Sequence, residues 1–270
     1  MLLPSPQTLP AVPRPSRLIV LQLQQAAAEL LITDRPDLSF APHWHEAWSV
    51  GAISQGVCRF TCEGQAREAH AGDVIVMRPL AVHTASVSPH RFEMVMAYLP
   101  TDWVGHALGW PRGQSPTAVT VTRHDPPLTQ ALSQAAHQRQ AADLGRAALL
   151  ALQQALPPAV DFAVPAALPA RVIALCQSLQ ADEAASVDIA ALARRAGMSR
   201  EHLHRLFRKT IGLTPQEYAR LARVARAKRL LLQGTTLSHA ALECGFADQA
   251  HFSRWFKRIF GVTPAAYGAE

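Results

Sequence analysis

Cysteine is scarce in this chain, and its spacing carries no motif. The 270 residues include four cysteines, and none of the spacings between them matches the Cys-x-x-Cys pattern of zinc or redox sites. This excludes a disulfide-stapled fold, so we expect buried free thiols. A redox pair of Cys58 and Cys62 stays open, because both residues would share one face of a strand.

Long hydrophobic runs are also lacking. No segment approaches the roughly 18 uninterrupted apolar residues of a membrane helix, and the N-terminus has no basic segment followed by an apolar core. We therefore expect a cytoplasmic protein without a membrane partner. With 49% hydrophobic and 17% charged residues, the composition excludes a disordered protein and favours two globular domains.

Proline and charge divide the chain. Residues 1–15 contain five prolines and predict a disordered lead-in, and the proline-rich residues 156–169 predict a semi-rigid linker. Residues 171–270 carry 15 Lys and Arg against 8 Asp and Glu, whereas the first 170 residues carry 11 against 12. A basic module after a near-neutral one indicates that only the C-terminal module meets a polyanion.

Residues 16–155 predict a β-barrel followed by a helical pair. Short apolar runs broken by turn signals, such as residues 57–62 and 74–77, are typical of a small sandwich or barrel. Between residues 127 and 156, apolar residues recur every three or four positions, which indicates amphipathic helices. Their apolar stripe would pack on the barrel or form a dimer interface.

The C-terminal module, residues 170–270, contains a repeat. Gly212-Leu213-Thr214-Pro215 followed by Tyr218 returns 49 positions later as Gly261-Val262-Thr263-Pro264 followed by Tyr267. A helix rich in arginine and aromatic residues precedes each copy, which predicts two helix-turn-helix units. A helix over residues 214–232 would join them, with Thr214 as its N-cap. Its cations are suited to phosphate contact: Arg220, Arg223, Arg226, Lys228 and Arg229.

Each unit has a second helix with an inward and an outward stripe. We expect Ser199 and Asp248 to cap these helices. The residues expected inward are Leu203, Leu206 and Phe207 in the first unit, and Phe252, Trp255, Phe256 and Ile259 in the second. The residues expected to face DNA are Glu201, His204, Arg205 and Arg208, and then Ala250, Ser253, Arg254 and Lys257.

Residues 171–267 resemble the DNA-binding domain of AraC/XylS-family transcriptional regulators. The strongest match runs through residues 241–246, 251–257 and 261–264. The resemblance implies base contacts from Glu201, His204 and Arg205 in the first unit, and from Gln249, Ala250, His251 and Arg254 in the second. Arginine can bridge guanine and glutamine can bridge adenine. The plainer alternative is that these are solvated polar positions.

His43-Trp44-His45-Glu46, together with Gly72-Asp73, Pro79 and His83, resembles the cupin-type effector domain that precedes the DNA-binding domain in many members of that family. Two imidazoles at i and i+2 share a strand face, so with His83 three nitrogens could meet as a divalent transition metal requires. The glutamate of catalytic cupins is missing, because Ser49 and Val50 stand in its place. We therefore assign no metal and leave His43, His45 and His83 as candidates. An organic effector held by these histidines with Trp44 and Trp48, or a structural hydrogen-bond cluster, is the alternative.

The prediction is thus an α+β protein of two domains. A cupin-like β-barrel with a helical pair precedes an all-α domain of two helix-turn-helix units joined by a long helix. The resemblance implies a regulator, not an enzyme, that binds double-stranded promoter DNA, responds to a small-molecule effector and influences RNA polymerase. A homodimer and a divalent metal are left open, and no cofactor is required. The alternative function is a metal-dependent cupin enzyme or metal sensor fused to a DNA-binding domain.

Overall fold

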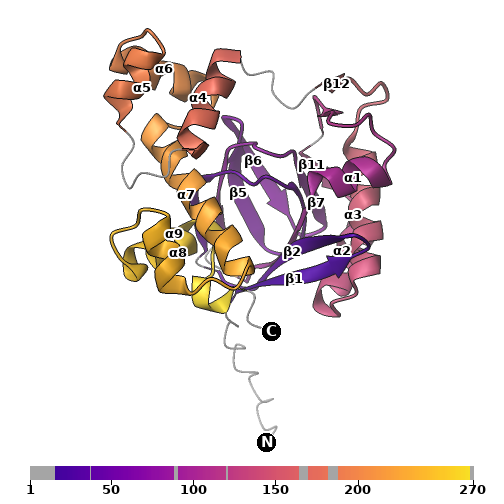
Figure 1. Ribbon diagram of the computed structural model, residues 1–270. Coiled ribbons are helices and arrows are strands. Elements are labelled where there is room, and N and C mark those ends of the chain that lie inside the picture. The colour runs from indigo at the N-terminus through magenta and orange to yellow at the C-terminus, as the bar shows by residue number, and fades with distance from the viewer. Residues whose placement is uncertain are drawn as a thin grey trace, which may run out of the picture.

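The computed structural model describes residues 16–36, 38–87, 91–119, 121–163, 170–181 and 188–267. The lead-in predicted for residues 1–15 lies outside this part of the chain. Figure 1 shows a β-barrel with one group of helices on either side. None of the helices described is both long and apolar enough to span a lipid bilayer.

Two antiparallel sheets form the barrel. The larger has the order β1-β2-β9-β4-β7-β11 and the smaller the order β3-β8-β5-β6. Their strands are β1 (Arg17–Leu23), β2 (Ala26–Thr33), β3 (Ser39–His43), β4 (Trp48–Gln55), β5 (Val57–Cys62), β6 (Gln65–His70), β7 (Asp73–Met77), β8 (His83–Val87), β9 (Glu93–Leu99) and β11 (Thr122–His124). The turn between β5 and β6 is made by Glu63 and Gly64, both with positive φ.

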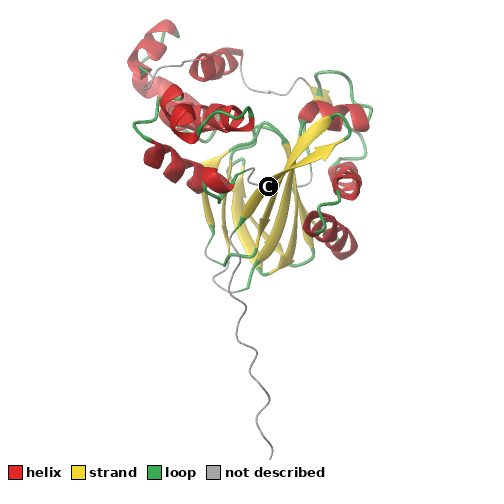
Figure 2. Cartoon of the chain, turned by 60° about the horizontal axis from the view of Figure 1, so that its bottom comes forward, coloured by secondary structure: helices red, strands yellow, loops and turns green. Residues whose placement is uncertain are grey.

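The two faces of the larger sheet belong to different cores. Inward residues such as Ile53, Met77 and Met94 fill the barrel. Outward residues such as Val50 and Val76 pack against α2 (Pro126–His137) and α3 (Ala141–Ala155). The apolar stripe of the helical pair therefore lies on its own barrel, and Figure 2 shows this pair on the side opposite the C-terminal helices. A further helix, α1 (Thr101–Ala107), follows β9.

The C-terminal domain is helical. Its helices are α4 (Ala170–Ala181), α5 (Ile189–Arg195), α6 (Arg200–Thr210), α7 (Pro215–Leu232), α8 (Leu237–Glu243) and α9 (Gln249–Phe260). The predicted N-caps are confirmed, since the side chains of Ser199, Thr214 and Asp248 accept hydrogen bonds from the first turns of α6, α7 and α9. Thr214 and Glu217 also form a reciprocal capping box, which fixes the start of the long connecting helix.

The two domains pack against each other, and of the linker predicted for residues 156–169 the structure describes residues 156–163. One apolar cluster runs from the barrel interior into the C-terminal domain. Leu18 of β1 also forms an isolated parallel bridge with Tyr267. Within the predicted linker, β12 (Phe162–Ala163) pairs with β10 (Ser115–Pro116), which ties its first part to the barrel domain. Burial of apolar side chains across the interface outweighs the spacing effect of the prolines.

Gly261 ends α9 where that helix meets the barrel. Its φ is +75°, and a Cβ there would lie 2.9 Å from Cε1 of Phe40 on β3. Its counterpart in the first repeat, Gly212, has a φ of +82° but only Val82 within reach, at 3.8 Å. The two glycines therefore share the left-handed backbone and differ in what surrounds them.

We expect Gly261→Ala to destabilise the protein more than Gly212→Ala. The backbone strain costs about 1–2 kcal/mol at either position, and overpacking against Phe40 adds about 1–3 kcal/mol at Gly261 alone. Chemical denaturation of both variants measures the difference. Equal losses would mean that the contact between α9 and β3 is not tightly packed.

Candidate functional site

Two helices of the C-terminal domain present their polar stripes to solvent. In α6 the side chains of Glu201 and Arg205 are exposed and His204 is half-buried, while Leu203 and Phe207 are buried beneath them. In α9 the residues Gln249, Ala250 and Arg254 are exposed. The buried residues of α9 are Phe252, Phe256, Ile259 and Phe260. The 3.6-residue period therefore places the two stripes as predicted, except that Leu206 and Trp255 are only half-buried.

Three of these predicted DNA-contact residues also have partners within the protein. The Glu201 carboxylate is held at the start of α6, where the backbone N–H of Glu201 and then the Ser199 hydroxyl lower its pKa. His251 is half-buried, and its Nε2 accepts a hydrogen bond from Trp255 Nε1 at 3.1 Å. The side-chain oxygen of Gln249 accepts from Ser238 at 2.7 Å. Base contacts from these residues stay predictions, and Arg205 and Arg254 are the longest exposed side chains of the set.

Trp255, which was predicted to point inward, packs against the edge of the apolar core and stays half-buried. Its ring also contacts two guanidinium groups, 4.2 Å from Arg220 and 5.2 Å from Arg258. Cation–π attraction explains why a large aromatic residue stays near the surface here. A helical period alone counts tryptophan as apolar and misses this arrangement.

The cations of α7 were expected to face phosphates, and the structure gives them other partners. Arg220 stacks on Trp255, Arg223 donates to the carbonyl of Gly245, and Arg226 pairs with Glu243. Lys228 and Arg229 pair with glutamates of the barrel. These contacts stabilise the protein's own packing, because half-buried cations such as Lys228 need partners, whereas Arg229 stays exposed.

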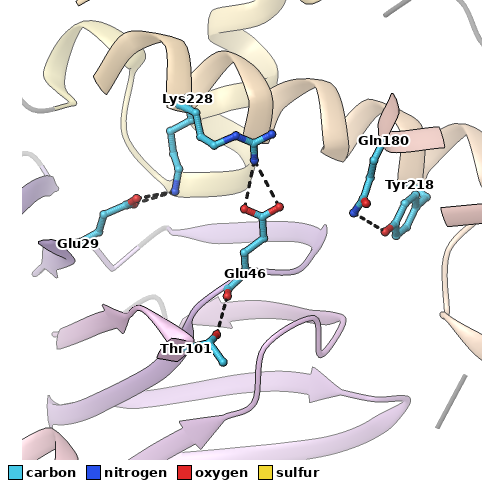
Figure 3. A network of polar contacts seen from close by, with 7 residues as sticks. Glu29, Glu46, Thr101, Gln180, Tyr218 and Lys228 are labelled. Carbon is cyan, nitrogen blue, oxygen red and sulfur yellow. Dashed lines mark hydrogen bonds and ion pairs between the residues drawn. The ribbon is translucent and has the colours of Figure 1, made fainter. Parts of the chain in front are cut away.

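Two ion pairs bind α7 to the barrel (Figure 3). Lys228 Nζ lies 2.7 Å from Oε1 of Glu29 on β2, with side chains only 16% and 18% exposed. Arg229 Nη1 lies 3.1 Å from Oε2 of Glu46, and these side chains are 53% and 54% exposed. Sequence reasoning missed both pairs, and no local signal could have found the first, because its partners are 199 residues apart.

Trp44 and Glu46 make further contacts between the barrel and the helices. The Trp44 ring lies 5.7 Å from the ring of Tyr218 on α7. The Tyr218 hydroxyl in turn accepts a hydrogen bond from Gln180 on α4. The backbone carbonyl of Glu46 accepts from the Thr101 hydroxyl at 3.1 Å. This short segment is therefore held from both sides.

The structure brings the three predicted histidines together inside the barrel. His43 on β3 and His83 on β8 are direct partners in the antiparallel ladder, and their rings lie 4.2 Å apart. The ring of His45 lies 4.9 Å from that of His43 and 5.3 Å from that of His83. One nitrogen from each ring lies within 4.8 Å of the others. All three side chains are buried.

Hydrogen bonds fix the orientation of two rings. His43 Nδ1 lies 2.7 Å from the carbonyl oxygen of Ala41, and His83 Nδ1 lies 2.8 Å from that of Ala81. A carbonyl can only accept, so each Nδ1 donates and each neutral ring keeps its Nε2 lone pair. His45 Nε2 is buried without a hydrogen-bond partner. The Nε2 lone pairs of His43 and His83 are therefore available, and the Nε2 of His45 has no protein partner.

Burial keeps these histidines neutral. Desolvation, with a smaller contribution from His83, holds the pKa of His43 well below its usual range. Desolvation is also the main cause that lowers the pKa of His45, followed by His43, His83 and Lys228. Burial lowers the pKa of His83 to about 4. Neutral imidazole is the form that coordinates metal ions.

A cavity of about 40 Å³ lies beside the histidines. Its polar lining includes His43, His83 and Tyr98, and Met77, Met94 and Met96 contribute to its apolar lining. This space suits an ion or a few water molecules and is far below the roughly 300 Å³ of a drug-sized ligand. An organic effector would require the barrel to expand.

The two tryptophans predicted for the effector site lie outside this cavity lining. Trp48 is fully buried in the other core and packs on Trp110 at 5.5 Å. Trp44 faces Tyr218. The proposed pocket role is therefore not supported for Trp48, because its side chain lies on the opposite face of the sheet.

All four cysteines are buried free thiols, as expected.

Known proteins match both halves of the chain. The model of the AraC-like ligand binding domain matches residues 26–157, and a helix-turn-helix domain model matches residues 192–270. The transcriptional activator RhaS of Escherichia fergusonii is 40% identical over 96 residues, 35% of this chain and 34% of that protein. The chain thus spans about a third of the length of RhaS.

Two further relatives are matched over more of their length. The transcriptional regulator YbfI of Bacillus subtilis is 28% identical over 226 residues, covering 78% of this chain and 81% of that protein. The transcription factor PqrA of Proteus vulgaris is 38% identical over 90 residues, 33% of this chain and 72% of that protein.

A solved structure shares the two-domain fold. The crystal structure of ToxT from Vibrio cholerae aligns with a TM-score of 0.55 at 12% identity, over 88% of this chain and 95% of that chain. The sheet-rich domain followed by a helical domain is therefore a known arrangement. With an AraC-like ligand-binding domain before a helix-turn-helix domain, the chain belongs to the AraC family of transcriptional regulators.

Proposed function

We propose that this protein regulates transcription by placing α6 and α9 in successive major grooves of promoter DNA. The supporting observation is the pair of exposed stripes on these helices, each with one long arginine side chain, Arg205 and Arg254. Helix α7 connects the two units, and its 18 residues span about 27 Å. That length suits two reading helices about one duplex turn apart, roughly 34 Å.

The barrel acts in this proposal as the sensor domain. Its family model is that of a ligand-binding domain, and its cavity, which would have to expand to hold an organic effector, lies beside His43 and His83. Effector binding would favour one arrangement of the two domains if that arrangement binds the effector more tightly. Contact with RNA polymerase and self-association belong to the same proposal.

We propose no catalytic role for the barrel. The relatives are transcriptional regulators. Among the described residues, the cluster of metal-ligating side chains holds three histidines and no carboxylate. The kind of relative therefore favours a sensory role for this cluster.

Selection of bound sequences from a random DNA pool tests the DNA-binding proposal with the full chain. We expect a bipartite site whose two halves are centred about 10–10.5 base pairs apart. Footprinting on a selected sequence should show protection of both halves on one side of the duplex. Recovery of sequences without a shared motif would contradict the proposal.

A further inference from the structure

The cluster of three buried histidines points to a binding site separate from the DNA-reading helices. We propose that His43, His45 and His83 bind one divalent transition-metal ion of the zinc class, and that the ion stabilises the packing of the helical domain on the barrel. The inference concerns the barrel and its interface and does not depend on which DNA sequence is bound.

The donor set fits such an ion. Three imidazoles are typical ligands of zinc, copper, iron and nickel, and three protein ligands leave a further position for water or an effector. The backbone carbonyls of Ala41 and Ala81 orient two rings by accepting from Nδ1, as carbonyl and carboxylate oxygens do behind the histidines of metal sites. The partnerless Nε2 of His45 is a buried polar atom that an ion would satisfy.

The spacing fits after a small contraction. Zinc holds nitrogen ligands at about 2.0–2.1 Å, which places them about 3.3 Å apart in a tetrahedron. The three nitrogens already lie within 4.8 Å of one another, so small side-chain movements reach this spacing. The cavity beside His43 and His83 leaves space for the fourth ligand.

Along residues 43–46, the proposed metal ligands alternate with residues that contact the helical domain. His43 and His45 contribute imidazoles, while Trp44 packs on Tyr218 and Glu46 pairs with Arg229. The His45 ring itself lies 6.1 Å from that of Phe260 at the end of α9. An ion that fixes His43 and His45 therefore also fixes the two residues that contact the helical domain.

Metal binding is tested first on the full chain stripped of metal by a chelator. We expect one Zn²⁺ per chain by titration calorimetry and elemental analysis, and a rise in melting temperature of about 5 °C or more at saturating zinc. Co²⁺ should give the visible absorption of a nitrogen-ligated site. No stoichiometric zinc at micromolar concentrations would overturn the proposal.

Ligand variants assign the site. His83→Gln and His45→Gln should each lower zinc affinity by at least about 10- to 100-fold, the loss that outer-shell changes alone produce. His106→Ala, an exposed histidine on α1, is the matched control and should bind zinc as the unchanged chain does. Circular dichroism checks that the variants fold. Unchanged zinc binding in both glutamine variants would overturn the assignment.

The link to domain packing is tested by reciprocity. If zinc stabilises the packed arrangement, a variant that disturbs this packing must bind zinc more weakly by the same factor. Gly261→Ala disturbs the contact of α9 with β3 without changing charge, and Gly212→Ala has the same backbone strain elsewhere. We expect a severalfold loss of zinc affinity in Gly261→Ala only. Equal affinities in the two variants would overturn the link.

Discussion

Replacing Arg254 with alanine is expected to weaken binding to the selected DNA sequence by about 5- to 150-fold while changing binding to random DNA far less. An arginine in the major groove contacts guanine through two hydrogen bonds, worth about 1–3 kcal/mol of discrimination. Arg254 is exposed on the stripe of α9 opposite the buried Phe252 and Phe256. Its removal should relax the preference at one base pair. Competition binding with specific and random duplexes measures both effects.

A matched control on the same helix is Lys257→Ala. Lys257 is exposed three residues further along α9 and is expected to meet phosphate at most. Its loss should weaken specific and random DNA alike and reduce the salt slope by about one. Arg205→Ala tests the corresponding position of α6. If Arg254→Ala behaves like Lys257→Ala, the base-reading stripe has been misplaced.

Replacing Lys228 with methionine is expected to lower the free energy of unfolding by about 3 kcal/mol. The change leaves the largely buried Glu29 carboxylate without its cation, which is costly where water cannot replace it. Lys228 also lies 4.8 Å from the Phe260 ring, so a cation–π contact is lost too. Chemical denaturation monitored by circular dichroism measures the loss.

Arg229→Met is the control, because Arg229 sits next to Lys228 and also pairs with a barrel glutamate. That pair is more than half exposed, so its loss should cost less than about 1 kcal/mol. The double variant Glu29→Gln with Lys228→Met should recover part of the stability, since no unpaired charge remains. Equal destabilisation by the two single variants would refute the distinction between the pairs.

Local signals predicted much of the fold. The caps at Ser199, Thr214 and Asp248, the repeated helix pairs and the strand at residues 57–62 follow from residue preferences that act over a few positions. The meeting of His43, His45 and His83 was also predicted. The barrel pairs His43 with His83, as expected, but β3 ends at His43, so the position of His45 beside them does not follow from strand alternation.

Contacts between distant segments could not be predicted in the same way. Strand β4 is buried on both faces over most of its length, so its pattern does not tell which face lines the cavity, and Trp48 was placed on the wrong one. The sequence alone is equally compatible with α7 cations that contact DNA phosphates and with α7 cations that pair with groups of the protein itself. Only the docking of α7 on β2 makes Glu29 the partner of Lys228.

The shared segment at residues 43–46 limits how freely the two domains can be exchanged during evolution. A helical domain recombined onto another barrel would lose the partners that Tyr218 and Arg229 have in Trp44 and Glu46. The same exchange would leave residues 43–46 of this barrel without their contacts to the helical domain. We therefore expect chimeras of this protein to keep the packing of their domains only when residues 43–46 and the helical surface that contacts them come from the same parent.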